Sequence, residues 1–165
     1  MVAEIEALGV SALAVSADVG DHAAVYFRTN LLGVMNCCHA ALPGMVALGK
    51  GRLVTIVSDV GRVGDARLAA YAAAKAGAAG FVRAIAREAG RFGITANAIS
   101  PSTLEPNLDD AAKATFLVSE QAKTRLSRYV IRRFGRPDDV GHMALLLCSD
   151  ASGWITGQTY PVNGG

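Results

Sequence analysis

The stretch from Ser58 to Lys75 places the strongest constraint on what this chain can fold into. It follows an apolar, β-branched run, RLVTIVS, which is typical of a buried strand that ends at Ser58. A glycine-containing loop comes next, and then a helix of small residues that carries Tyr71 and Lys75. A buried strand that leads through a loop into a helix is the repeating unit of a parallel α/β sheet.

Strands and helices alternate along the rest of the chain in the same way. Strands are predicted within 11–18, 52–58, 93–100 and 151–165. Helices are predicted over 2–8, 29–48, 67–92, part of 111–131 and 138–150, and Asp21 is a possible N-cap for a short helix over 23–28. Pro43 is expected to bend or end the last third of its helix. The alternation predicts one Rossmann-like α/β domain over residues 1–165, a doubly wound parallel sheet truncated to about four strands.

The spacing of Tyr71 and Lys75 places both side chains on one helix face, one turn apart. A lysine ammonium beside a phenol favours the phenolate, so such a tyrosine can donate or accept a proton near neutral pH. Ser58 can hydrogen-bond the oxygen that gains or loses this proton. Because tyrosine and lysine four residues apart also occur on helix surfaces without a chemical role, the pair alone does not establish an active site.

The composition limits the classes of function. A formal net charge of +2 and a hydrophobic content of 52% argue against nucleic acid or an anionic membrane as the main partner. No apolar run reaches about 18 residues without a charge or a glycine, so no membrane span is expected. The N-terminus does not have the pattern of a signal peptide, and a cytoplasmic location is expected. The three cysteines and three histidines show no metal-ligand spacing, so no metal site is predicted.

Several ordered motifs resemble the short-chain dehydrogenase/reductase family, in particular its 3-oxoacyl-(acyl-carrier-protein) reductase-like members. Ser58, Tyr71 and Lys75 match the family pattern, and the resemblance continues through NAISP, RRFGRPDDV, CSDASGWITGQ and VNGG. It covers residues 28–165 strongly and 1–21 fairly well. It implies an oxidoreductase that transfers a hydride between NAD or NADP and a small carbonyl or secondary alcohol substrate.

Carried over by position, the resemblance implies four catalytic residues. Tyr71 is the general acid or base, Ser58 orients and polarises the substrate oxygen, and Lys75 favours the phenolate and binds the nicotinamide ribose. Asn30 matches an asparagine that holds a water in a proton relay. The alternative interpretation is that the Asn30 side chain only hydrogen-bonds the backbone of its own helix. The implied cofactor-binding residues are Asp18, Val19, Tyr71, Lys75, Pro101 and Thr103.

Some of these positions depart from the family pattern. Asp18 and Val19 match the positions that lie near the adenine ring in the family. The alternative interpretation of Asp18 is that it only caps a turn at the end of a strand. Where the family has a glycine after Pro101, this chain has Ser102. The threonine expected near the nicotinamide is replaced by Pro106, and Thr103 is out of register.

Two segments of the family fold have no counterpart in this sequence. No glycine-rich turn for the pyrophosphate opens the chain, so binding of NAD or NADP is expected to be weakened or lost. Only eleven residues lie between Asp18 and Asn30, where the family has a further helix and strand. We therefore expect the strand that ends at Asp18 to occupy the vacant place beside strand 52–58.

Three functions remain open at this level. The first is the dehydrogenase described above. The second is a catalytically crippled remnant that acts only as an oligomerisation or interaction module. The apolar helices near 30–48 and 68–92 resemble the family's interface helices and predict a homo-oligomer, either a dimer or a tetramer. The third is a lyase on the same fold, which Lys75 disfavours because such relatives carry an arginine at this position.

Overall fold

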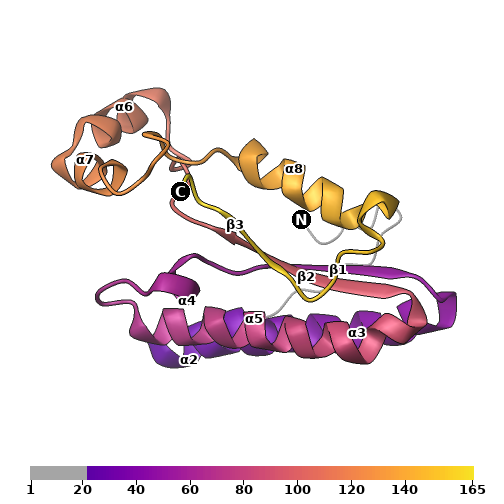
Figure 1. Cartoon of the computed structure of the whole chain (residues 1–165). Coiled ribbons are helices and arrows are strands. Elements are labelled where there is room, and N and C mark those ends of the chain that lie inside the picture. The colour runs from indigo at the N-terminus through magenta and orange to yellow at the C-terminus, as the bar shows by residue number, and fades with distance from the viewer. Residues whose placement is uncertain (1–21) are drawn as a thin grey trace.

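The computed structural model describes residues 22–165, which form layers of helices on both faces of a parallel sheet (Figure 1). The predicted helix 2–8, the predicted strand 11–18 and the candidate cofactor contacts of Asp18 and Val19 lie outside the described residues. The described strands are β1 (Gly51–Ile56), β2 (Ile94–Pro101) and β3 (Thr159–Val162). They are parallel and lie in the order β1-β2-β3. The prediction of a doubly wound α/β fold is confirmed, with three strands in the part of the chain that the structure describes.

Helices cover both faces of the sheet. A long helical segment before β1 consists of α2 (His22–Phe27), the π-helical turn η1 (Arg28–Leu32) and α3 (Gly33–Leu48). It lies beside α5 (Ala69–Ala89) on one face, and α8 (Pro137–Cys148) lies on the other (Figure 1). The shorter elements are α4 (Val60–Val63), η2 (Gly90–Phe92), α6 (Asp110–Val118), α7 (Glu120–Leu126) and η3 (Asp150–Ser152).

The helical segment before β1 differs from its prediction in two ways. The predicted helices 23–28 and 29–48 form one continuous helical segment from His22 to Leu48, and Pro43 lies inside α3 without ending it. Leu42 and Met45 pack against the core on either side of the proline, and this burial offsets the hydrogen bond that a proline removes. The helix ends instead at Gly49, whose φ of 63° is the left-handed conformation that favours glycine.

This helical segment is also more exposed and more apolar than an ordinary surface helix. Residues Ala24–Leu48 have a mean hydropathy of 1.6, and only 6% of the apolar window is buried. By length and composition alone the segment could cross a membrane, although Arg28, Gly33 and Gly44 interrupt its apolar run, and the expectation of no membrane span stays a prediction. The core helix of a soluble protein meets the same criterion, and the finding therefore assigns no membrane.

The hydrophobic core lies between α5 and the sheet. Ala78, Val82 and Ala86 recur along one face of α5 and pack with Ala96 and Ala98 of β2. Because these side chains are short, the backbone of α5 lies close to the sheet. This packing fixes the position of the helix that carries Tyr71 and Lys75 relative to the end of β1.

Candidate active site

Tyr71 and Lys75 lie in the first half of α5, and both side chains are half-buried. The Nζ atom of Lys75 lies 5.8 Å from the centre of the Tyr71 ring. Burial lowers the pKa of the Lys75 amine, because the charged form loses part of its hydration. The structure thus places the predicted lysine against the predicted tyrosine.

Lys75 also contacts the strand that leads to Ser58. Its Nζ donates a hydrogen bond to the carbonyl oxygen of Ile56, 2.9 Å away. Ile56 is the last residue of β1 and comes two residues before Ser58. The ammonium therefore lies between the tyrosine ring and the carboxyl end of β1.

Ser58 lies in the loop between β1 and α4. Its Oγ accepts a hydrogen bond from the N–H of Val60 at 3.3 Å, and its carbonyl accepts one from the N–H of Gly61. A Cβ atom at Gly61 would lie 2.9 Å from the backbone nitrogen of Ala76, so only glycine allows this close approach to α5. The loop is thereby packed against the turn of α5 that carries Lys75.

Asn30 lies in η1, where the N–H of Gly33 bonds the carbonyl of Arg28 five residues earlier. Such single π-helical turns within α-helices are frequent at functional sites. η1 packs against α5, and nearby Tyr26 contacts the Tyr71 ring edge to face with 5.5 Å between ring centres. Asn30 is therefore on the same side of the sheet as Tyr71 and Lys75.

A cavity of about 320 Å³ lies at the carboxyl edge of the sheet. One wall is the loop that carries Ser58, together with Asp65 and Leu68. The other wall comes from residues 102–134, which carry α6 and α7 and which we call the lid. The lid contributes Ser102, Thr103, Arg125, Arg128 and Tyr129. Of the predicted site residues, Ser58 and Thr103 line this cavity, whereas Asn30, Tyr71, Lys75 and Pro101 do not.

Tyr129 is among the residues of this cavity that the sequence prediction missed. Its hydroxyl lies 2.8 Å from Ser102 Oγ and accepts a hydrogen bond from the N–H of Thr103 at 3.3 Å. Burial raises the pKa of Tyr129, but hydrogen bonds with Ser102 and Thr103 and the nearby charge of Arg125 together hold it below its ordinary value. The one signal in the sequence was Ser102, which replaces the family's glycine.

Thr103 lines the cavity at the start of the lid and is bonded to later lid residues. Its N–H donates to Tyr129, its carbonyl accepts from the N–H of Gly135, and its Oγ1 accepts from Arg125 at 3.4 Å. Its contact with a nicotinamide stays a prediction. Pro101 ends β2, and its carbonyl accepts a hydrogen bond from the N–H of Asp59 at 3.0 Å.

The described residues fit only one end of a dinucleotide. Tyr71 and Lys75 present a hydroxyl and an amine suited to the hydroxyl groups of a ribose. The glycine loop after β1 is not a phosphate cradle, because Gly61 is packed against the backbone of α5. Within residues 22–165, no group of three or more His, Cys, Asp or Glu side chains is placed to bind a metal ion.

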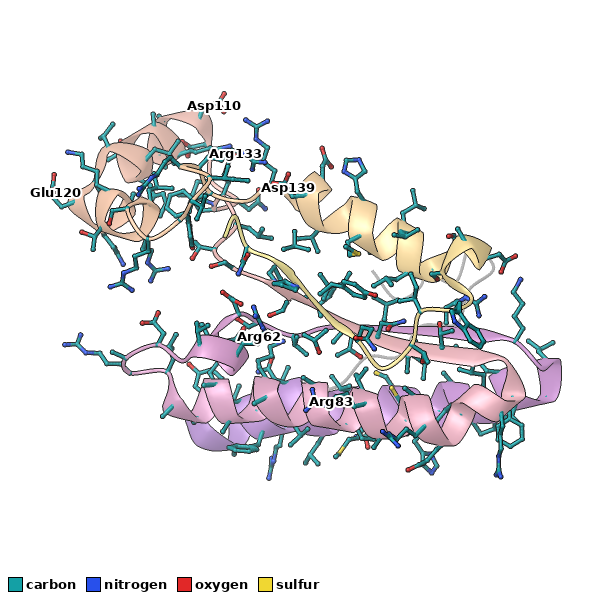
Figure 2. The ribbon with its side chains drawn as sticks, viewed as in Figure 1. Arg62, Arg83, Asp110, Glu120, Arg133 and Asp139 are labelled. Carbon is teal, nitrogen blue, oxygen red and sulfur yellow. The ribbon has the colours of Figure 1, made fainter. Side chains whose placement is uncertain are left out.

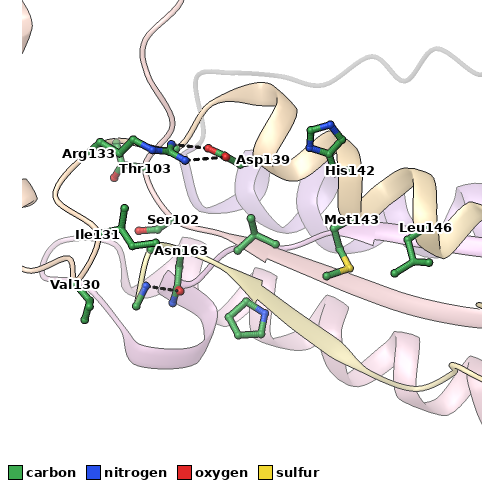
Figure 3. Close-up of a pocket in the computed structure, with 15 residues that line it drawn as sticks. Ser102, Thr103, Val130, Ile131, Arg133, Asp139, His142, Met143, Leu146 and Asn163 are labelled. Atoms are coloured by element: carbon green, nitrogen blue, oxygen red, sulfur yellow. Dashed lines mark hydrogen bonds and ion pairs between the residues drawn. The ribbon is translucent and has the colours of Figure 1, made fainter.

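A larger cavity of about 760 Å³ lies between β3, α8 and the end of the lid (Figure 3). Ser102 and Thr103 line it as well, so the start of the lid separates the two cavities. Arg133 of the lid lies near Asp139 of α8 (Figure 2), and two hydrogen bonds of 2.6 and 2.9 Å from Arg133 to Asp139 join the lid to α8 (Figure 3). Hydrogen bonds to the Asp139 carboxylate hold its pKa well below its usual range. Those from the Arg133 guanidinium have the largest effect, and the one from the N–H of Arg136 has the next largest.

Comparisons with known proteins place this geometry in a wider context. A family model described as enoyl-(acyl carrier protein) reductase matches residues 5–165. The 3-oxoacyl-(acyl-carrier-protein) reductase of Staphylococcus aureus is 39% identical over 137 residues, which cover 83% of this chain and 54% of that protein. The chain thus spans about half the length of the curated relatives it matches.

Solved structures give a consistent result. A gluconate 5-dehydrogenase from Burkholderia cenocepacia J2315, in complex with NADP and tartrate, is similar with a TM-score of 0.76 and 30% identity. The match covers 87% of this chain and 55% of that one. A short-chain type dehydrogenase/reductase from Mycobacterium ulcerans has a TM-score of 0.77 and 29% identity, over 88% of this chain and 52% of the other.

Proposed function

The chain belongs to the short-chain dehydrogenase/reductase family, and from this premise we propose that it transfers a hydride between NAD or NADP and a carbonyl or secondary alcohol. Its relatives include NAD(P)-dependent reductases. The observation that best supports the proposal is the position of Lys75. Its amine lies 5.8 Å from the centre of the Tyr71 ring and bonds the end of the strand that leads to Ser58.

In this proposal each residue has a separate task. Tyr71 donates its phenolic proton to the substrate oxygen during reduction and accepts it back during oxidation. Ser58 donates a hydrogen bond to the same oxygen and stabilises the negative charge that develops on it. Lys75 stabilises the phenolate that remains on Tyr71. When bound, the nicotinamide supplies or accepts the hydride.

Asn30 and the lid complete the proposed site. Asn30, in the π-helical turn beside α5, holds a water through which the proton reaches solvent. The lid excludes bulk water from the cavity beside Ser58, with Tyr129 as its hydrogen-bonded contact to the end of β2. We propose that the substrate is a small molecule that occupies this cavity on the side of Ser58 and extends beyond it to Tyr71, which does not line the cavity.

We further propose a cytoplasmic homo-oligomer that associates through α3 and α5. Leu32, Val46 and Leu48 are exposed by 48%, 37% and 80% along the helical segment before β1. Contact with a second copy would remove this apolar surface from water. An inactive interaction module is the alternative, and the absence of a fitting phosphate cradle in the described residues favours it.

Titration of the purified chain with NADH and with NADPH tests the proposal. Cofactor fluorescence and melting temperature report binding, which we expect at micromolar concentration. A substrate screen follows, in which Tyr71→Phe keeps cofactor binding and loses at least about 100-fold in turnover. A chain that melts cooperatively but binds neither cofactor would establish the inactive module instead.

A further inference from the structure

The cavity beside Ser58 has two arginines on its lid side. Arg125 belongs to α7, Arg128 follows the end of that helix, and both line the cavity. Within residues 22–165 neither arginine forms an ion pair with a carboxylate. Exposed arginines without such a partner are common, so the comparison with the other cations of the lid decides what these two indicate.

The other cations of the lid are engaged with protein groups. Three of them form ion pairs with carboxylates, namely Lys113, Lys123 and Arg133. The fourth, Arg132, donates hydrogen bonds to two backbone carbonyls of the lid. The two lid cations that bond neither a carboxylate nor a carbonyl through their side chains are therefore the two that line the cavity beside Ser58.

Arg125 is held against the cavity wall by a single hydrogen bond. Its Nη1 donates to Thr103 Oγ1 at 3.4 Å, and Thr103 lines the same cavity. A guanidinium has five N–H groups, so most of its donors are left for a ligand. The Arg128 side chain has no hydrogen bond to any residue in 22–165. The lid wall of the cavity thus offers a set of free, positively charged donors.

Two carboxylates on the opposite wall offset part of this charge. Asp59 is engaged, since it pairs with Arg62 and accepts a hydrogen bond from Asn163 Nδ2 at 3.0 Å. Asp65 is exposed and forms no ion pair with a described residue. Two unpaired arginines against one unpaired aspartate suit a ligand with a single negative charge. A carboxylate carries one such charge, whereas a phosphate carries about 1.5 to 2 near neutral pH.

We propose that the substrate of this site is a carbonyl compound that also carries a carboxylate, which Arg125 and Arg128 bind inside the cavity. The inference rests on the proposed function, because that function places the reacting oxygen at Ser58 and Tyr71. Guanidinium groups donate two parallel hydrogen bonds to a carboxylate, a geometry that a lysine does not provide. The volume of about 320 Å³ is at the lower end of the range for ligand pockets, which favours a small oxo acid. The carboxylate takes no part in the transfer of hydride or proton and only fixes the orientation of the carbonyl.

Titration of the full 165-residue chain with oxo acids, in the absence of cofactor, tests the inference. The probes are 2-oxopentanoate, 4-oxopentanoate and 6-oxoheptanoate, which differ in the distance from carbonyl to carboxylate, and the methyl ester of each is its uncharged match. Binding is followed through the amide resonance of Thr103, which lines the cavity. We expect at least one acid to bind about tenfold or more tightly than its ester, because hydrogen bonds between charged groups are the stronger ones.

Substitution of each arginine, with a matched control, locates the bound carboxylate. Arg128→Gln removes one charge and breaks no side-chain hydrogen bond within residues 22–165, so it should weaken binding of that acid about tenfold or more and leave the melting temperature unchanged. Arg125→Gln should weaken binding to a similar extent, and Arg125→Lys should restore part of the affinity. Arg83 is also exposed and without an ion pair among the described residues, but it lies on α5, away from the lid (Figure 2). Arg83→Gln should therefore change the affinity by less than about twofold.

Several results would overturn the inference. Every acid could bind no more tightly than its ester, or Arg83→Gln could weaken binding as much as Arg128→Gln, which would indicate a general attraction of anions. Dihydroxyacetone phosphate could bind more tightly than every acid, which would assign the arginines to a phosphate instead. If Arg125→Gln loosens the lid through loss of its bond to Thr103, the result for Arg128→Gln decides.

The titration also separates this inference from the proposed function. Because no cofactor is present, failure of the chain to bind NADH leaves the result unaffected. Conversely, if the chain reduced uncharged ketones as efficiently as the best acid, the proposed function would stand and the inference about the carboxylate would be wrong.

Discussion

Lys75 donates a hydrogen bond to the carbonyl oxygen of Ile56, 2.9 Å away, and so joins the candidate catalytic helix to the end of β1. A half-buried ammonium is a strong hydrogen-bond donor to a backbone carbonyl. The same amine lies near the Tyr71 ring, where the proposed chemistry requires it. Because the ammonium has three N–H groups, one lysine serves both the end of β1 and the tyrosine.

Replacement of Lys75 tests its role in proton transfer. Lys75→Met keeps most of the side-chain length and removes the charge that stabilises the phenolate. We expect turnover to fall by about 100-fold or more, measured as NAD(P)H absorbance with an accepted substrate. Lys75→Arg keeps a cation of different shape and should retain part of the activity. Unchanged turnover in Lys75→Met would exclude this residue from the catalytic pair.

Leu147 and Leu145 provide a matched test of the face that α8 presents to the sheet. Leu147 is fully buried, whereas Leu145 in the same helix is 71% exposed. Leu147→Ala leaves a cavity and should lower the free energy of unfolding by about 2–5 kcal/mol. Leu145→Ala should change it by less than about 0.5 kcal/mol. Urea unfolding measures both, and equal effects would contradict the observed orientation of α8.

The main strands and the helix with Tyr71 and Lys75 could be predicted because their patterns are local. RLVTIVS is a buried β-branched run, and the helix after it shows small residues at helical spacing. The continuation of the helix through Pro43 could not, since contacts of Leu42 and Met45 with a distant core decide it. Tertiary burial here outweighs a local helix breaker.

The candidate site was predictable to the same extent. Ser58, Tyr71 and Lys75 share one short stretch, so their spacing alone indicates that they lie near one another. Tyr129 belongs to the lid and meets Ser102 only through the fold, 27 residues away in sequence. The orientation of Thr103 toward this lid, and away from a cofactor, depends on that same long-range contact.

Gly93 and Gly90 test the turn between α5 and β2. Gly93 has a φ of 72°, and a Cβ atom there would collide with the carbonyl oxygen of Gly49. Gly93→Ala should therefore destabilise the chain by more than about 1 kcal/mol, through backbone strain and this clash. Gly90 has a helical φ of −57° and open space around it. Gly90→Ala should stabilise the chain by about 0.4–1 kcal/mol, and a lower melting temperature for Gly90→Ala than for Gly93→Ala would refute the assignment.

The pH dependence of stability tests the contact between the lid and α8. Arg133 donates two hydrogen bonds to Asp139, and the N–H of Arg136 donates a third at 2.7 Å. These bonds hold the pKa of Asp139 well below its unfolded value, which is about 3.9. The folded state therefore binds this proton less readily than the unfolded state. The resulting stability is fully present above pH 4 and is lost as the pH falls toward the folded-state pKa.

Asp139→Asn should remove this acid-sensitive stability. The variant should be less stable than the unmodified chain at pH 7, and the difference should shrink as the pH is lowered from 5 to 2.5. Asp138→Asn is the control, because it removes a neighbouring charge in the first turn of α8 without breaking the bonds to Arg133. Urea unfolding at a series of pH values gives the difference directly. If the two stability curves for Asp139→Asn and the unmodified chain run parallel over this range, the contact with Arg133 does not hold the lid to α8 in solution.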